Sequence, residues 1–292
     1  MNCASLSERP LVVKVKYQHT LARDIALSGV GLHTGCTTTV TISPAPANAG
    51  FSFVLADGSR IAATPEAVRS TVRCTTLGSS TAEVNTVEHL LAALMGMDVD
   101  NAVIHIDGEE VPVMDGSALP FAQAIARAGL REQHVPRRIL ELNAPYWHRD
   151  GDKLLVCVPS QTFKINFFVA FPEPVGNQFL ETPPLTPEYF LREIAPNRTF
   201  GFRSEVEALY RQGLALGGSL DNAVVIDRHE YMGPLRFPDE IVRHKVLDLI
   251  GDFALLGMHP SFEVIALKSG HALHVAAARE LRAPLRAAAG AR

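Results

Sequence analysis

The two halves of this chain repeat one order of predicted elements, and this repetition constrains the fold more than any single segment does. In the first half, short alternating strands such as residues 36–43 are followed by a helix, a strand and a second helix. Asn85 is a residue type that starts helices and Gly96 one that follows them, so the pattern predicts a helix between them. We expect the next strand over 102–107 and the second helix over 120–129.

The second half repeats this order after a polar, proline-containing stretch at residues 132–138, where we place a domain boundary. The predicted domains are therefore residues 1–135 and 136–292. The elements predicted in the second domain are strands within 139–171, a helix over 203–212, a long helix that starts after Pro238 and ends near Gly257, a strand over 263–268 and a helix over 272–289.

A short internal similarity accompanies this repetition. Residues 87–94 (VEHLLAAL) and 242–249 (VRHKVLDL) place a histidine, His89 or His244, at the same point of two helices. Eight positions are too few to establish a duplication. Two related domains could nevertheless direct these two histidines toward one metal ion.

Composition and charge exclude several classes of protein. The chain is 47% apolar and 20% charged, which is sufficient for one large domain or two ordinary ones. Its formal net charge is −4 and its Lys and Arg residues are scattered, so we expect no nucleic-acid partner. No apolar run reaches the length of a membrane span and the N-terminus lacks a signal-peptide core, so we expect a soluble cytoplasmic protein with no integral membrane segment.

The cysteines limit the kind of metal site that this chain can build. Cys3, Cys36, Cys74 and Cys157 lie far apart and form no C-x-x-C pair. They therefore indicate neither a disulfide framework nor a thiolate zinc cluster. Any metal site must be made of histidine and carboxylate side chains.

The long helix of the second half contains four polar residues at four-residue steps, Glu240, His244, Asp248 and Asp252, which lie on one face of a helix. One interpretation is the solvated face of an amphipathic helix. The other is a metal site at His244 and Asp248. The rest of the helix is strongly apolar, and the two aspartates lie toward its C-terminal half, where the helix dipole disfavours anions unless a cation compensates.

The neighbouring residues Glu88 and His89 also have two interpretations. Asn85 followed three residues later by Glu88 fits a capping box, which requires no catalytic role. Alternatively, His89 binds a metal and Glu88 reaches a water on that metal, as zinc hydrolases require. No H-E-x-x-H motif is present, so the chain is not a standard metalloprotease.

Four further segments are weaker signals. His271 follows a predicted strand directly, a position from which side chains project into clefts, although a loop histidine without a role is the alternative. His33 lies in a glycine-rich turn that has neither P-loop nor dinucleotide spacing. Residues 198–202 and 216–219 have the small and aromatic residues typical of turns, with or without a bound ligand.

Seven blocks of sequence gain significance when they are taken together. In chain order they are 28–35 (SGVGLHTG), 86–90 (TVEHL), 112–117 (PVMDGS), 198–202 (RTFGF), 216–219 (LGGS), 242–248 (VRHKVLD) with 251–252 (GD), and 268–271 (KSGH). This series resembles the motifs of the bacterial UDP-3-O-acyl-N-acetylglucosamine deacetylases, the LpxC-type zinc enzymes. The blocks span about residues 20–275, nearly the whole chain, so a chance match of all seven is not credible.

The resemblance implies an α+β fold of two similar domains, each a β-sheet packed on helices, with the helix layers sandwiched between the two sheets. It also implies a zinc-dependent amidohydrolase that removes the 2-acetyl group of UDP-3-O-(3-hydroxyacyl)-N-acetylglucosamine and releases acetate, the first committed step of lipid A synthesis in bacteria. The implied Zn²⁺ ligands are His89, His244 and Asp248, with a fourth position left for water. The partner is this small-molecule substrate, and we expect a monomer with no fused dehydratase domain.

The same resemblance assigns roles to the residues around the metal. Glu88 accepts the proton of the attacking water. Thr199 and the Lys245 ammonium provide donors for the developing oxyanion. His271, as imidazolium, protonates the leaving amine, and Asp252 orients it and raises its pKa.

Substrate contacts are implied at a further group of positions. These are Phe200 and Lys245 for the sugar and diphosphate, the stretch from Val206 through Ala215 and Gly218 to Ser219 for an apolar tunnel holding the acyl chain, Phe171 for uracil, and His33. Ala170 stands where relatives can carry an acidic residue, which leaves the uridine contacts open, and Ala215 stands where a larger side chain can occur, which leaves the chain length open. The alternatives are a zinc amidase for another N-acyl sugar, and a catalytically inactive nucleotide-sugar or acyl-binding protein of the same fold.

Overall fold

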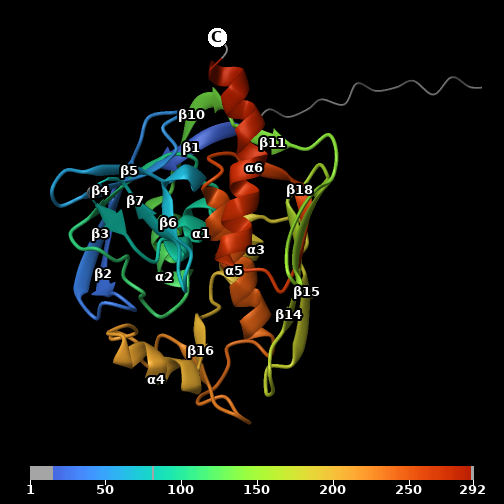
Figure 1. Ribbon diagram of the computed structural model, residues 1–292. Helices are drawn as coiled ribbons and strands as arrows, with labels where there is room; N and C mark the ends of the chain where they lie inside the picture. Colours follow the sequence, from blue (N-terminus) through green and yellow to red (C-terminus); the bar gives the residue numbers. More distant parts are fainter. Residues whose placement is uncertain (1–15, 81, 291–292) are drawn as a thin grey trace, which may run out of the picture.

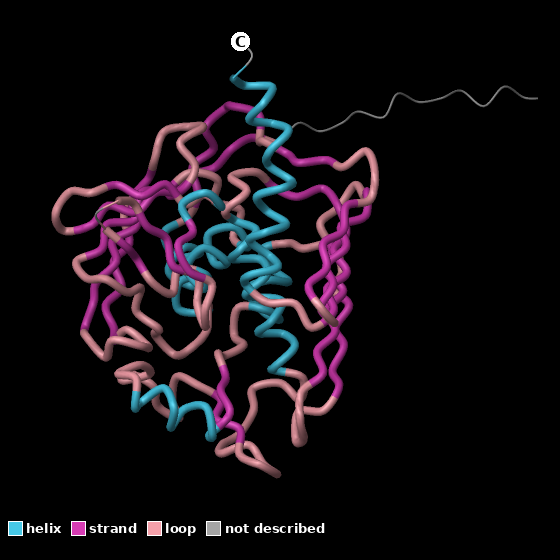
Figure 2. Tube along the Cα trace, in the orientation of Figure 1, coloured by secondary structure: helices cyan, strands magenta, loops and turns pink. Residues whose placement is uncertain are grey.

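The chain forms a sandwich of two sheets with helices between them, as a computed structural model of residues 16–80 and 82–290 shows. In Figure 1 the sheet of the first half lies on the left and that of the second half on the right. Between them lie α1 (Glu88–Gly96), α2 (Leu119–Ala128), α5 (Glu240–Ala254) and α6 (His271–Gly290). Figure 2 shows the same arrangement, with helices in the middle and strands on both sides. The predicted α+β sandwich is confirmed. Cys3 and residues 1–15, which form most of the segment on which the absence of a signal peptide was predicted, lie outside the described residues.

The N-terminal sheet has five strands in the order β2-β3-β9-β4-β5. Their bounds are β2 (Ile25–Val30), β3 (Thr37–Pro44), β9 (Ala102–Ile106), β4 (Phe51–Leu55) and β5 (Arg60–Ala62). Alternation along β3 buries Val40 and Ile42 against the helices and leaves threonines on the outer face. The pairs are antiparallel except β4 with β9.

Smaller elements complete the first half. A three-stranded sheet, β6-β7-β8, follows a short 3₁₀ helix, and a separate pair joins β1 to β10. Their bounds are η1 (Pro65–Ala67), β6 (Val68–Ser70), β7 (Thr76–Gly78), β8 (Glu83–Val84), β1 (Tyr17–Leu21) and β10 (Leu130–Pro136). The polar stretch 132–138 thus contributes to a strand, and the boundary placed there stays a prediction.

The C-terminal sheet has the order β12-β13-β18-β14-β15, with β11 pairing β18 as well. The bounds are β11 (Ile139–Glu141), β12 (Tyr146–Asp150), β13 (Lys153–Pro159), β14 (Lys164–Ala170), β15 (Asn177–Glu181) and β18 (His259–Leu267). The strand β14 alternates strictly, with Ile165, Phe167 and Val169 facing the helices.

The segment between β15 and α5 contributes both to the core and to one end of the sandwich, since Figure 1 shows α3 between the two sheets and α4 and β16 below them. It contains α3 (Pro187–Tyr189), a π-helical turn η2 (Phe190–Ile194), β16 (Phe200–Phe202), α4 (Arg203–Arg211) and β17 (Val224–Ile226), with β16 parallel to β17. Helices occur at all five predicted places, with ends shifted by at most three residues. No helix in the described part of the chain is long and apolar enough to span a bilayer.

The helices α1 and α5 pack directly against each other in the centre of one continuous hydrophobic core. Gly251 makes this close approach possible, because a Cβ atom there would lie 2.1 Å from the carbonyl oxygen of Glu88. A side chain at this position would therefore separate the two helices. The contact brings a helix of the first half beside a helix of the second half, and the candidate site lies at this junction.

Candidate metal and catalytic site

Glu88 and His89 lie in the first turn of α1, and the residue before that turn has an unusual backbone. Thr86 has a φ of 58°, in the left-handed region that β-branched residues rarely occupy. Its hydroxyl donates a hydrogen bond of 2.8 Å to the buried carboxylate of Glu110. That carboxylate also accepts the backbone N–H groups of His33 and Thr34. Glu110 therefore connects the start of α1 to the glycine-rich turn.

The predicted capping box at this helix is wrong. The helix begins at Glu88 with Val87 in the N-cap position, and no side chain caps it. The backbone of Asn85 instead exchanges hydrogen bonds with Glu109 and Val111 outside the helix. Gly96, expected just after the helix, is its last residue. Since the carboxylate of Glu88 is not used for capping, it is available to the site.

The polar stripe of α5 is buried. Glu240, His244, Asp248 and Asp252 are at most 4% exposed, so the interpretation as a solvated face is wrong. His244 and Asp248 are four residues apart on the face that meets α1. An otherwise apolar helix can carry these two side chains because they have partners at the contact with α1. Charged groups persist inside a protein only with partners.

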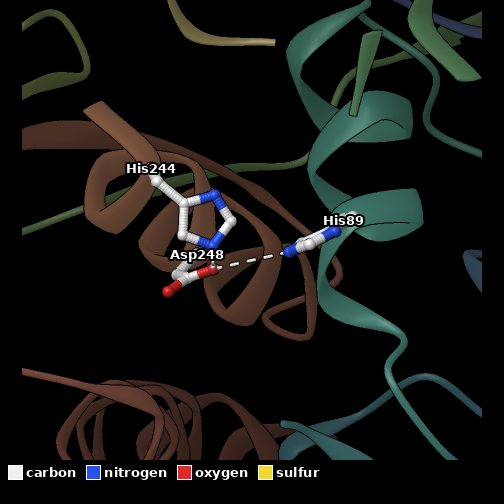
Figure 3. Close-up of side chains that lie close together, drawn as sticks. All are labelled: His89, His244 and Asp248. Atoms are coloured by element: carbon white, nitrogen blue, oxygen red, sulfur yellow. Dashed lines mark ion pairs between the residues drawn. The ribbon is translucent and has the colours of Figure 1, made fainter. Parts of the chain in front are cut away.

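His89, His244 and Asp248 converge on one point between the helices (Figure 3). One ligand atom from each lies within 4.8 Å of the others. The distance to Asp248 Oδ1 is 3.9 Å from His89 Nε2 and 3.3 Å from His244 Nε2. Two imidazole nitrogens and a carboxylate oxygen are a donor set that Zn²⁺ accepts, with the fourth tetrahedral position open in catalytic sites.

The protonation states of this triad also suit a metal ion. Burial, together with the neighbouring His244, lowers the pKa of His89 to about 3, and burial lowers that of His244. His244 Nδ1 donates to the carbonyl oxygen of Asn197 at 3.1 Å, which leaves the lone pair on Nε2. Burial would raise the pKa of Asp248, but His244 and Lys245 outweigh it and keep it well below its usual range. Neutral imidazoles beside a carboxylate are the forms that bind metals.

Glu88 lies beside the triad as a titratable carboxylate. Burial raises its pKa to about 7, with His271 acting in the opposite direction. Its Oε2 accepts the backbone N–H of Thr75 at 3.0 Å. A carboxylate with a pKa near neutrality suits a general base.

His271, the first residue of α6, belongs to a buried hydrogen-bonded group on the other side of the triad. Its Nδ1 donates to Asp252 Oδ2 at 2.8 Å, and His274 Nδ1 donates to the same oxygen at 2.8 Å. Burial alone would lower the pKa of His271, but the carboxylates of Asp252 and Asp248 outweigh it and raise the pKa to about 9. At neutral pH the imidazole is therefore protonated, with its Nε2 directed toward Asp248 at 3.9 Å.

Lys245 and Thr199, the expected oxyanion donors, both line the cavity that contains the triad. The Lys245 ammonium donates to Asp248 Oδ2 at 2.7 Å. The backbone of Thr199 is held at both ends, because its N–H donates to Gly116 and its carbonyl accepts from Val224. The structure thus brings both residues to the site, and their roles stay predictions.

Two adjoining cavities extend from the triad. The first, about 180 Å³, contains the polar residues named above, and the second, about 390 Å³, is largely apolar. Leu32, His33, Arg73, Thr199 and Phe200 line both. The residues expected along an acyl tunnel, Val206, Ala215, Gly218 and Ser219, all line the second cavity.

Phe171 is the expected contact that lies apart from these cavities. It packs against Phe200 and Phe202, with ring centroids 5.5 and 5.8 Å away. It therefore supports Phe200 from behind, and no wall of the two cavities includes it.

The sequence analysis missed four residues that contact the site: Thr75, Glu110, Asn197 and His274. Only His274 had a usable signal, because it follows His271 by three residues and so shares its helix face. Asn197 acts through its backbone carbonyl, which no residue type reveals. Thr75 and Glu110 lie in segments whose residue pattern does not indicate which distant residues their side chains contact.

Comparisons with known proteins give matches over most of the chain. The family model described as LpxC, UDP-3-O-acyl N-acetylglycosamine deacetylase, matches residues 18–283. The chain is 46% identical over 270 residues to the UDP-3-O-acyl-N-acetylglucosamine deacetylase of Anaeromyxobacter sp. (strain Fw109-5). The matched region is 91% of this chain and 88% of the relative. It is 46% identical over 275 residues to the enzyme of that name from Phenylobacterium zucineum (strain HLK1), a match that covers 91% of this chain and 94% of the relative. It is 46% identical over 263 residues to the enzyme of that name from Geotalea uraniireducens (strain Rf4), a match that covers 88% of this chain and 86% of the relative.

Proposed function

Since this chain belongs to the UDP-3-O-acyl N-acetylglycosamine deacetylase family, we propose that it hydrolyses the 2-acetamido group of UDP-3-O-(3-hydroxyacyl)-N-acetylglucosamine in the bacterial cytoplasm, in the first committed step of lipid A synthesis. One observation carries the proposal: α1 and α5 bring His89, His244 and Asp248 within 4.8 Å of one another. Glu88 and His271 line the same cavity, which adjoins an apolar one.

The metal in this proposal is zinc, held by His89, His244 and Asp248. Two neutral imidazoles and one carboxylate form a three-ligand set of the catalytic type. When bound, zinc supplies a Lewis acid that stabilises negative charge on the amide oxygen and makes a nearby water more acidic.

Glu88 and His271 divide the proton transfers between them. Glu88 takes a proton from the water as the water oxygen attacks the acetamide carbon, and its raised pKa suits that task. His271 then gives its proton to the sugar nitrogen as the carbon–nitrogen bond breaks, since a free amine anion cannot leave. The products are acetate and the free amino sugar, and water supplies the atoms that both gain.

Asp252, Thr199 and Lys245 support these two groups. The Asp252 carboxylate holds His271 in one orientation through Nδ1, so that Nε2 carries the proton to be transferred. We assign Thr199 and Lys245 to the developing oxyanion, where a well-placed donor contributes about 3 kcal/mol.

The adjoining cavities support a division of the substrate between them. We assign the sugar and diphosphate to the polar cavity with Phe200, Lys245 and His33, and the acyl chain to the apolar cavity with Val206, Ala215, Gly218 and Ser219. The largely apolar lining of the second cavity suits a hydrocarbon chain. Phe171 then supports the sugar contact indirectly through Phe200.

Acetate release from the acylated UDP-sugar tests the proposed function. We expect turnover by the zinc-loaded enzyme, its loss with a chelator and its return when zinc is added back. UDP-N-acetylglucosamine without the acyl chain is the control, and most activity should be absent with it because the apolar cavity stays empty. Equal rates on both sugars would indicate an amidase of other specificity, and no release from either would contradict the proposal.

A further inference from the structure

Thr75 lies behind the site and contacts Glu88, the assigned base, and Asp252, which holds the assigned acid His271. It is 0% exposed and lies just before β7. Its backbone N–H donates to Glu88 Oε2 at 3.0 Å, and its hydroxyl donates to Asp252 Oδ1 at 2.6 Å. It is absent from the walls of both cavities, so any influence on the reaction passes through these two carboxylates.

The bond to Glu88 selects which oxygen faces the reaction. Oε2 accepts the Thr75 backbone N–H, whereas Oε1 accepts no hydrogen bond from another described residue. Glu88 lines the polar cavity, so Oε1 is the oxygen available to a water there. A carboxylate held at one oxygen has lost most of its freedom to rotate, which favours a single orientation for proton transfer.

The bond to Asp252 determines the orientation of His271. Asp252 Oδ2 accepts N–H groups from His271 and His274, while Oδ1 accepts the Thr75 hydroxyl and no other donor in the described part of the chain. His274 is itself held, because its Nε2 meets the Ser269 hydroxyl at 2.8 Å. Without the Thr75 hydroxyl, Oδ1 would be a buried charged atom with no donor, and the carboxylate would be free to turn away from His271.

We propose that Thr75 is a positioning residue that aligns the general base Glu88 and the general acid His271 with each other. This inference rests on the proposed function, because it concerns the alignment of the two proton-transfer groups. One rigid residue contacts the base directly and the acid through Asp252, so the two groups keep a fixed relation although they come from α1 and α6. Binding of substrate does not involve Thr75.

The adjacent residue, Thr76, offers a matched control. It is also buried, at 5% exposure, and its hydroxyl also makes a hydrogen bond, to Asn85 Oδ1 at 2.8 Å. That bond lies outside the proton-transfer groups. Thr75→Val and Thr76→Val therefore remove the same atoms from neighbouring buried sites, and only the first removes a donor to Asp252.

The experiment compares kcat, KM, Tm and bound zinc for the wild type, Thr75→Val, Thr75→Ala, Thr75→Ser and Thr76→Val, with rates expressed per zinc-bound folded chain. For Thr75→Val we expect kcat about 10- to 100-fold lower with KM within about twofold and zinc retained. Thr75→Ala removes the same hydroxyl without adding bulk, and it is the test if the valine variant folds poorly. It should show the same fall in kcat at an unchanged KM. Thr75→Ser should recover most of kcat, and Thr76→Val should leave kcat unchanged.

Several results would overturn the role of Thr75. These are a kcat for Thr75→Val and Thr75→Ala within about twofold of wild type, a proportional rise in KM, or an equal loss in Thr76→Val. If the wild-type enzyme itself releases no acetate, the proposed function fails instead. The two failures are thus distinguishable.

Discussion

Two groups of carboxylates and histidines lie at the two ends of α1, and different cations complete them. At its start lies the catalytic cluster, which we define as Glu88, His89, His244 and Asp248. Just beyond its end lies the arginine cluster, which we define as Asp98, Asp100, Arg137 and His259. Both lie where the two halves of the chain meet, and both contain two carboxylates and at least one histidine.

In the arginine cluster the protein supplies its own cation. The Arg137 side chain is 3% exposed and reaches Asp98 Oδ1 at 2.8 Å and Asp100 Oδ2 at 2.9 Å. His259 contacts the other oxygen of Asp100 at 3.2 Å. The guanidinium has only donors, so it binds both carboxylates and takes the place that an external cation would hold.

In the catalytic cluster imidazole nitrogens face Asp248 Oδ1, while the Lys245 ammonium donates to the other oxygen, Oδ2. The Nε2 atoms of His89 and His244 lie 3.9 and 3.3 Å from Asp248 Oδ1, and His244 keeps its proton on Nδ1. Lone pairs directed at a carboxylate are unfavourable until a cation lies between them. Buried charge alone therefore does not indicate a metal site. The directions of the hydrogen-bond donors and of the imidazole lone pairs do.

The largest expected difference between the two clusters is the effect of removing a histidine. We expect His244→Ala to lose bound zinc, and acetate release to fall to background, because one of three ligands is removed. His259→Ala, at the arginine cluster, should keep zinc and activity. Elemental analysis and acetate assays of both variants check this. Full zinc occupancy in His244→Ala would refute the ligand assignment.

Within the catalytic cluster, mutation should separate the role of the general base from that of the metal ligands. We expect Glu88→Ala to retain zinc while turnover falls by roughly two to four orders of magnitude, because the attacking water loses its proton acceptor. Glu109→Ala, an exposed glutamate outside the cluster, is the control and should turn over normally. Unchanged turnover in Glu88→Ala would remove that residue as the base.

The arginine cluster should affect stability instead of chemistry. Arg137→Ala leaves Asp100 buried without its guanidinium, and we expect a loss of about 3 kcal/mol, or roughly 6 to 12 °C in Tm. Zinc content and kcat at low temperature should be preserved. The exposed neighbour in Arg138→Ala should shift Tm by less than about 2 °C. A loss of zinc in Arg137→Ala, measured on folded protein, would mean that the two clusters are not independent.

The smallest effect is the pH dependence of the arginine cluster. Burial would raise the pKa of Asp100, but His259 and Arg137 outweigh it and hold the pKa below its usual range. Because the folded value is the lower one, the contribution to stability is complete above about pH 4 and is lost as pH falls further. The Tm difference between wild type and Asp100→Asn should therefore shrink from pH 6 to pH 3. A constant difference across that range would show that Asp100 does not titrate in this way.

Much of the fold could be predicted because it depends on local pattern. Alternation along β3 and apolar periodicity along α5 depend on residues one to four apart, which share a face by backbone geometry alone. For the same reason, His244 and Asp248 could be paired from their spacing. The seven motifs added the family and with it the arrangement of layers.

Spacing alone left two interpretations open at two places, and the structure excludes one of them at each. Asn85 and Glu88 have the spacing of a capping box, yet α1 begins at Glu88 because Glu110 holds Thr86 in a left-handed conformation. The stripe on α5 has the spacing of a solvated face, yet α1 and its neighbours cover it. In both cases a residue distant in sequence decided between the two readings.

By itself, then, the sequence determined which segments form helices and strands, which side chains share a helix face, and which family the motifs match. Only the tertiary structure decided that Thr75 contacts both Glu88 and Asp252, and that Arg137 binds Asp98 and Asp100 beyond the opposite end of α1. The physical reason is range. Backbone geometry relates residues a few positions apart, whereas distances between segments depend on the packing of the whole core, as at Gly251, where the absence of one side chain lets α5 reach α1.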